Sequence, residues 1–130
     1  MRSLIVDDDP ICRSVLQHTL QPYGPVSYAV DGIQAVAEVA RSLAEGRPYD
    51  LITLDIMMPD LDGKLALKLI RRLEELFAVV KASQIAMTSA MDDKSTIMGA
   101  FREQADLYFV KPLKLDQMIS ELRQAQLITS

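Results

Sequence analysis

Short apolar runs alternate with longer amphipathic stretches along the chain, and this alternation limits the possible folds more than any other feature of the sequence. Continuous apolar runs are typical of strands buried on both faces, whereas apolar residues three or four positions apart are typical of helices. The pattern predicts strands over residues 4–6, 26–30, 50–55, 84–88 and 107–110, and helices over residues 10–21, 33–44, 66–77, 93–104 and 115–122.

Strict alternation of strands and helices predicts an α/β fold with a doubly wound, five-stranded parallel sheet. A parallel connection needs a crossover, and the crossovers place helices on both faces of the sheet. Apolar residues alternate with polar or small ones only in residues 26–30, so we expect the edge strand there.

Two of the predicted helices have apolar residues at helical spacing, and we expect these residues to face the sheet. In the first of them they are Ile33, Val36, Ala37, Ala40, Leu43 and Ala44. In the second they are Ala66, Leu69, Ile70, Leu73, Leu76 and Phe77, with Lys68, Arg71, Arg72, Glu74 and Glu75 largely off that face and expected in solvent.

The length of 130 residues predicts one domain over residues 1–130, with no output domain present, so the chain is expected to be either a single-domain protein or one domain of a longer protein. The single cysteine, Cys12, cannot form an intramolecular disulfide, which favours a reducing, cytoplasmic location. A net charge of −4 gives no basic surface for nucleic acid, and no apolar run approaches the roughly 18 residues of a membrane span. Direct DNA binding and membrane insertion are therefore disfavoured.

Polar residues follow several of the predicted strands, at the sheet edge where ligands of such folds bind. These residues are Asp7, Asp8, Asp55, Thr88, Ser89 and Lys111. Clustered carboxylates raise one another's pKa unless a cation neutralises them, and an all-oxygen donor set suits Mg²⁺. Mg²⁺ beside a carboxylate, a hydroxyl and a lysine is suited to phosphoryl transfer, in which a carboxylate can be the nucleophile.

The segments LIVDDDP, LITLDIMMPDLDG, IAMTSA and YFVKP resemble the receiver domain of two-component response regulators. The resemblance extends over essentially the whole chain, with each motif at the predicted end of a strand. It implies a flavodoxin-like sheet with the strand order 2-1-3-4-5.

The resemblance also implies individual roles for the residues of these motifs. Asp55 would be the phosphoacceptor and also a Mg²⁺ ligand, Asp8 a direct Mg²⁺ ligand and Asp7 its partner, acting through water. Met57 would contribute only its backbone carbonyl to the metal, and Lys111 would pair with the phosphoryl group.

The switch residues follow from the same resemblance. Tyr108 would be the switch aromatic, and Pro112 would follow a cis Lys111–Pro112 bond that shapes the loop. Ser89 is preferred as the switch hydroxyl, because the family usually places it 22 positions before the lysine and 111 − 89 = 22; Thr88 is the alternative.

Three positions bear on how this chain differs from other receivers. Met57 and Met91 stand where the family modulates dephosphorylation by placing or excluding water, and a thioether orients water poorly. We therefore expect a long-lived phosphoryl group. Gln104 stands where many receivers have glycine.

The expected partners are a sensor histidine kinase or phosphotransfer protein and a downstream target protein. Phosphorylation would draw in the Ser89 hydroxyl, turn Tyr108 inward and bias the surface formed by residues 93–104, 107–110 and 115–122, through which a homodimer could also form. The protein would be no enzyme beyond its own aspartyl phosphorylation and dephosphorylation.

Two other functions compete with this interpretation. A haloacid-dehalogenase-like phosphatase also uses an aspartate nucleophile, but it needs a second acid two residues later, where this chain has Met57. A phosphorylation-independent interaction module could keep the pocket residues without using them. Metal affinity and phosphate uptake separate these possibilities.

Overall fold

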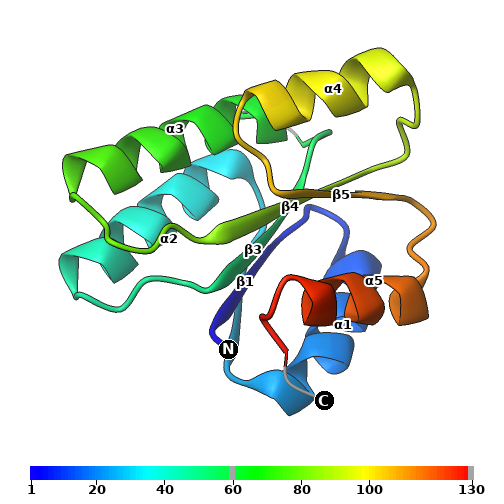
Figure 1. Cartoon of the computed structure of the whole chain (residues 1–130), viewed down its shortest axis with the longest axis horizontal. Coiled ribbons are helices and arrows are strands. Elements are labelled where there is room, and N and C mark those ends of the chain that lie inside the picture. Colours follow the sequence, from blue (N-terminus) through cyan, green and yellow to red (C-terminus); the bar gives the residue numbers. More distant parts are fainter. Residues whose placement is uncertain (59–60, 129–130) are drawn as a thin grey trace.

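The computed structural model describes residues 1–58 and 61–128 of the chain. A five-stranded sheet has the order β2-β1-β3-β4-β5, and every neighbouring pair is parallel. The strands are β1 (Ser3–Val6), β2 (Val26–Ala29), β3 (Leu51–Asp55), β4 (Gln84–Ser89) and β5 (Leu107–Val110). The predicted fold class, the strand order and the edge position of β2 are confirmed (Figure 1).

The helices are α1 (Pro10–Leu20), α2 (Gly32–Ala44), α3 (Gly63–Leu76), α4 (Lys94–Arg102) and α5 (Leu115–Gln124), and a 3₁₀ turn η1 (Gln21–Tyr23) follows α1. The first four helices share a start signal, an aspartate whose carboxylate accepts a hydrogen bond from a backbone N–H in the first turn. These aspartates are Asp9, Asp31, Asp62 and Asp93. Each such cap stabilises its helix by about 1 kcal/mol, which fixes where the chain turns back after the preceding strand.

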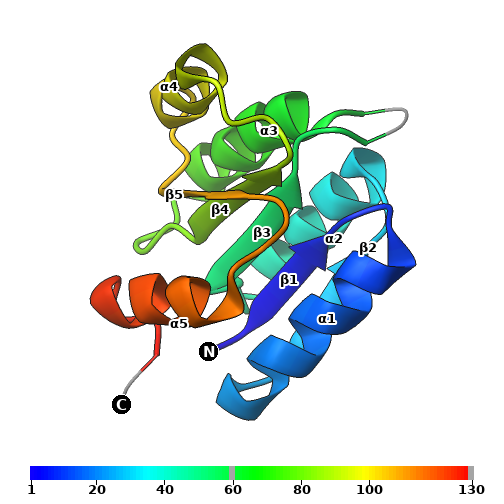
Figure 2. The ribbon, with the colours of Figure 1, turned by 90° about the vertical axis from the view of Figure 1, so that its right-hand side faces the viewer.

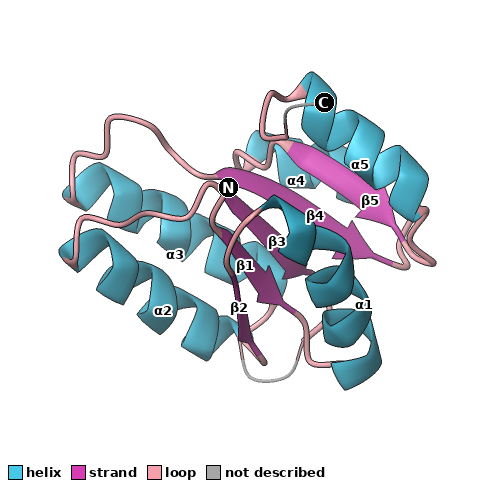
Figure 3. Ribbon diagram, turned by 90° about the horizontal axis from the view of Figure 1, so that it is seen from below, coloured by secondary structure: helices cyan, strands magenta, loops and turns pink. Residues whose placement is uncertain are grey.

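Helices cover both faces of the sheet (Figures 2 and 3). Leu16 of α1 and Met118 of α5 belong to one buried cluster, while Val39 of α2, Ile70 of α3 and Ala100 of α4 belong to the other. Within residues 1–58 and 61–128, none of the helices has the length and apolarity to span a membrane.

The predicted inward face of α2 is only partly correct. Leu43 is buried as expected, but Ile33 is 58% exposed and Ala37 and Ala44 are also exposed. The sheet is instead contacted by a face that includes Ala35 and Val39, which are fully or almost fully buried. Apolar residues occupy two sides of this helix, so the helical period alone could not select the buried side.

The third helix departs from its prediction in the same way. Ala66 and Ile70 are buried as expected, whereas Leu69, Leu76 and Phe77 are exposed. Leu67, which the pattern did not place on the inward face, is buried in the core instead.

The charged residues of α3 differ in their exposure to solvent. Arg72 and Glu75 lie in solvent as predicted, but Arg71 and Glu74 do not: their side chains are only 10% and 7% exposed. The prediction that all four form a solvated face is therefore wrong for Arg71 and Glu74.

Candidate functional site

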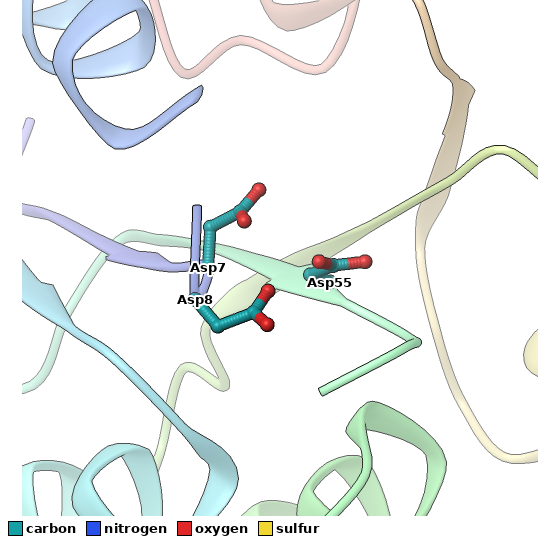
Figure 4. Close-up of side chains that lie close together, drawn as sticks. All are labelled: Asp7, Asp8 and Asp55. Carbon is teal, nitrogen blue, oxygen red and sulfur yellow. The ribbon is translucent and has the colours of Figure 1, made fainter. Parts of the chain in front are cut away.

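Three carboxylates meet at the carboxyl edge of the sheet (Figure 4). Asp7 and Asp8 follow β1 and Asp55 ends β3, and each offers an oxygen within 4.8 Å of the others. Asp7 and Asp55 are buried, whereas Asp8 is exposed. Because neighbouring parallel strands end at the same edge, the register that pairs Val6 with Leu54 sets these side chains beside one another.

Lys111 is the cation of this cluster. Its Nζ donates to Asp7 Oδ2 at 3.0 Å and to Asp55 Oδ2 at 3.3 Å. Burial alone would lower the pKa of Lys111, but its contacts with Asp7 and Asp55 hold that pKa above the ordinary value. The lysine therefore stays charged and neutralises part of the acidic cluster.

One ammonium does not balance this cluster. Burial, together with the negative charge of Asp7, raises the pKa of Asp55 to about 6, although Lys111 acts in the opposite direction. Three carboxylates lie around the Lys111 ammonium, so negative charge exceeds positive charge in this cluster. An added divalent cation would lower the pKa of Asp55, and the three carboxylates provide the oxygen donors that Mg²⁺ prefers. The residues present therefore fit a Mg²⁺ ion.

The backbone around Asp55 is closely packed. The Met57 N–H donates to Asp55 Oδ1 at 3.3 Å. A Cβ atom on Gly63 would overlap the carbonyl oxygen of Asp55, so only glycine lets α3 begin this close to the end of β3. The Met57 side chain is 65% exposed, and the role of its carbonyl as a metal ligand stays a prediction.

Ser89 and Thr88 are both buried but point to opposite faces of the sheet, because side chains alternate along a strand. Ser89 lies on the face of Met87, against which Tyr108 also packs. Ser89 Oγ accepts the Met91 N–H at 3.0 Å, and the Tyr108 hydroxyl donates to the Met91 carbonyl at 2.7 Å. This connection favours Ser89 as the switch hydroxyl and leaves Thr88 as the alternative.

The loop after β5 has the predicted conformation. The Lys111–Pro112 peptide bond is cis. The Lys111 N–H donates to the Ser89 carbonyl at 2.7 Å, which holds the start of this loop against the end of β4.

Sequence reasoning missed a second polar cluster, at the opposite end of β4 and β5. The guanidinium of Arg71 donates to Glu74 at 2.7 Å, to Asp106 at 2.7 Å and to the backbone carbonyls of Ser83 and Gln104. Gln104 has a φ of 74°, and its carbonyl accepts two of these bonds. No local pattern could have revealed the cluster, since Gln104 and Asp106 lie 33 and 35 residues from Arg71.

The fold and the acidic edge define a receiver domain of two-component signalling. The family model "Response regulator receiver domain" matches residues 3–123, so the chain belongs to the response regulator receiver family. The resemblance of the four sequence motifs is thereby confirmed.

Curated relatives and solved structures agree with this assignment. The chain is 34% identical over 123 residues to the chemotaxis protein CheY of Bacillus subtilis, covering 93% of each chain. It is 28% identical over 127 residues to CheY of Listeria monocytogenes, covering 96% of this chain and 98% of the relative. The receiver domain of the histidine kinase CKI1 from Arabidopsis thaliana, solved with Mg²⁺ and BeF₃⁻, superposes with a TM-score of 0.81 at 27% identity and covers 95% of this chain and 89% of that one.

Proposed function

We propose that this protein is a phosphoacceptor switch in which Asp55 takes a phosphoryl group from a phosphohistidine of a sensor kinase or phosphotransfer protein. The observation that carries the proposal is the buried Asp55 carboxylate beside Lys111 and two further carboxylates. The presence of Mg²⁺ and BeF₃⁻ in the related CKI1 receiver supports it.

In the proposed reaction, an oxygen of the Asp55 carboxylate attacks phosphorus in line. The P–O bond to Asp55 forms as the P–N bond of the donor breaks, and the leaving imidazole takes up a proton. Lys111 Nζ, already 3.3 Å from Asp55, pairs with the incoming phosphoryl oxygens. Asp7, Asp8, Asp55 and the Met57 carbonyl would hold Mg²⁺, which supplies further neutralisation of phosphoryl charge when bound.

We expect the structural change that follows phosphorylation to pass from Ser89 to Tyr108. A phosphoryl oxygen that accepts a hydrogen bond from the Ser89 hydroxyl would move the loop that carries Met91. The Tyr108 hydroxyl bonds to that loop and its ring is already half-buried, so loop movement would change its packing. The surface of α4, β5 and α5 would then be biased toward binding a downstream protein or a second copy.

The aspartyl phosphate is expected to be long-lived, because Met57 and Met91 orient water poorly. A cytoplasmic location, a single receiver domain over residues 1–130 and the absence of any catalysis beyond the protein's own phosphorylation and dephosphorylation also stay predictions.

The test is the intact mass of the protein after incubation with acetyl phosphate, with and without Mg²⁺. We expect a gain of one phosphoryl mass that requires Mg²⁺ and is lost in Asp55→Asn. Asp92→Asn, which removes an exposed carboxylate from the loop before α4, is the matched control and should keep the gain. Uptake that persists in Asp55→Asn would refute the acceptor assignment, and no uptake by the wild type would favour a phosphorylation-independent module.

A further inference from the structure

Apolar residues, most of which the sequence pattern predicts in the core, instead form one exposed surface across α2 and α3. We call it the α2–α3 face and define it by Ile33, Ala37 and Ala44 of α2 and Leu65, Leu69 and Leu76 of α3. All six side chains are exposed, Leu76 by 75%. The two helices lie side by side on the same face of the sheet (Figures 1 and 3).

The spacing of this face is regular. Positions 33, 37, 40 and 44 of α2 and positions 65, 69, 72 and 76 of α3 both follow a four-three-four repeat. Such a repeat forms the contact seam of paired helices, yet here all of its residues are exposed except Ala40, which is half-buried. Of these eight residues only Arg72 is charged.

The two halves of the face differ in shape. Three alanines of α2, at positions 37, 40 and 44, form a low shelf, whereas the three leucines of α3 form a ridge. The helices start close together, because a Cβ atom on Gly32 would overlap the carbonyl oxygen of Leu61, two residues before α3 begins. Shelf and ridge therefore run beside each other from the same end.

The outer flanks of the face differ in charge. The α2 flank carries Glu38, Arg41 and Glu45, a net charge of 1 − 2 = −1. On the α3 side, Lys64, Lys68 and Glu75 of the flank, together with Arg72 of the repeat itself, give a net charge of 3 − 1 = +2.

We propose that the α2–α3 face binds a second copy of this chain, related by a two-fold axis that runs parallel to α2 and α3 and between them. This axis places the leucine ridge of each copy over the alanine shelf of the other, so that each contact is made twice. It also brings the acidic flank of α2 in one copy to the basic flank of α3 in the other. Both shape and charge are thus self-complementary under one rotation.

The size of the α2–α3 face sets the expected affinity of the dimer. Helices of 13 and 14 residues are about 20 Å long, and two of them side by side cover a width of about 20 Å. This footprint corresponds to the lower end of specific interfaces. We therefore expect a weak, reversible dimer that forms without Mg²⁺ or a phosphoryl donor.

Sedimentation velocity from about 10 μM to 1 mM tests this dimer with unphosphorylated protein. The weight-average mass of the wild type should rise from the monomer value of 14.5 kDa toward twice that value. Leu69→Glu and Ala37→Glu, which place a charge on the ridge and on the shelf, should each weaken association at least tenfold. Circular dichroism and urea unfolding would verify that each variant is folded.

A matched control lies on the other candidate surface. Phe101→Glu changes a 43% exposed apolar residue of α4 and should leave association unchanged. A wild type that stays monomeric at 1 mM would overturn the proposal. So would a dimer that Phe101→Glu disrupts and Leu69→Glu does not.

Disulfide cross-linking tests how the two copies align in the dimer and needs no charged substitutions. The proposed axis brings position 37 of one copy close to position 69 of the other. A mixture of Ala37→Cys protein and Leu69→Cys protein should therefore form disulfide dimers faster than either variant alone, with the wild type as the control for Cys12. Equal rates in the mixture and in the separate variants would refute the proposed arrangement.

Discussion

Replacing Arg71 by methionine should strongly destabilise the protein, although the residue lies far from the acidic edge. The guanidinium is about nine-tenths buried and bonds to two carboxylates and two backbone carbonyls. Removing one partner of a buried ion pair costs about 3–5 kcal/mol, because the other charge is left uncompensated. Glu74 keeps the hydrogen bond from the Ser83 N–H at 2.7 Å, so we expect about 3 kcal/mol for Arg71→Met, toward the lower end of that range.

Urea unfolding followed by circular dichroism measures this change. With a denaturant dependence of about 2 kcal/mol per molar urea, the midpoint should fall by about 1.5 M. Arg72→Met is the matched control on the same helix, since Arg72 is 75% exposed and lies 3.8 Å from Glu75. Pairs of this kind contribute about 0–1 kcal/mol.

The double variant Arg71→Met/Glu74→Gln tests whether the loss of stability comes from the uncompensated charge of Glu74. Glu74→Gln removes the buried charge but can still accept the Ser83 N–H, so it should recover part of the stability that Arg71→Met loses. If Arg71→Met costs no more than Arg72→Met, the cluster does not stabilise the fold as argued.

Three further results are expected. Because the pKa of Asp55 is raised to about 6 in the folded protein, its contribution to the free energy of unfolding is present below pH 4 and lost as the pH rises through 6. We therefore expect the free energy of unfolding of Asp55→Asn, relative to that of the wild type, to increase by up to about 3 kcal/mol between pH 4 and pH 7.5, measured by urea unfolding without Mg²⁺. Parallel pH profiles of the two proteins would contradict this. Lys111→Met removes the ammonium that bonds to Asp7 and Asp55, so calorimetric titration should show Mg²⁺ affinity rising at least tenfold; unchanged affinity would mean that the lysine does not compete with the metal. Replacing Met57 by asparagine or Met91 by glutamate should shorten the phosphoryl lifetime several-fold by mass spectrometry, and a wild-type lifetime of only seconds would refute the argument from poor water placement.

The sequence was sufficient to predict the acidic edge. Each of Asp7, Asp55 and Lys111 directly follows or ends an apolar run, and parallel strands that cross over by helices must end at a common edge. Local chemistry also sets the start of α1, because Asp9 caps the helix and a proline occupies its first turn. These inferences succeed because they depend on neighbours in the sequence and on general rules of connection.

The inward faces of α2 and α3 were harder to predict. A helix advances about 100° per residue, so a helix with apolar residues on two sides satisfies the same pattern in two rotations. Ile33 and Leu76 fit the repeat as well as Val39 and Ile70 do, and only contact with the sheet distinguishes them.

The sequence by itself thus determined the element order and the residues at the strand ends, because both depend on short-range chemistry and on the geometry of parallel crossovers. The tertiary structure decided which apolar residues are buried and which charges are paired. Arg71 can leave solvent only because Gln104 and Asp106, more than thirty residues away, supply acceptors for its guanidinium. A periodic pattern contains no information about such distant partners, since burial of a charge depends on what the fold brings to it.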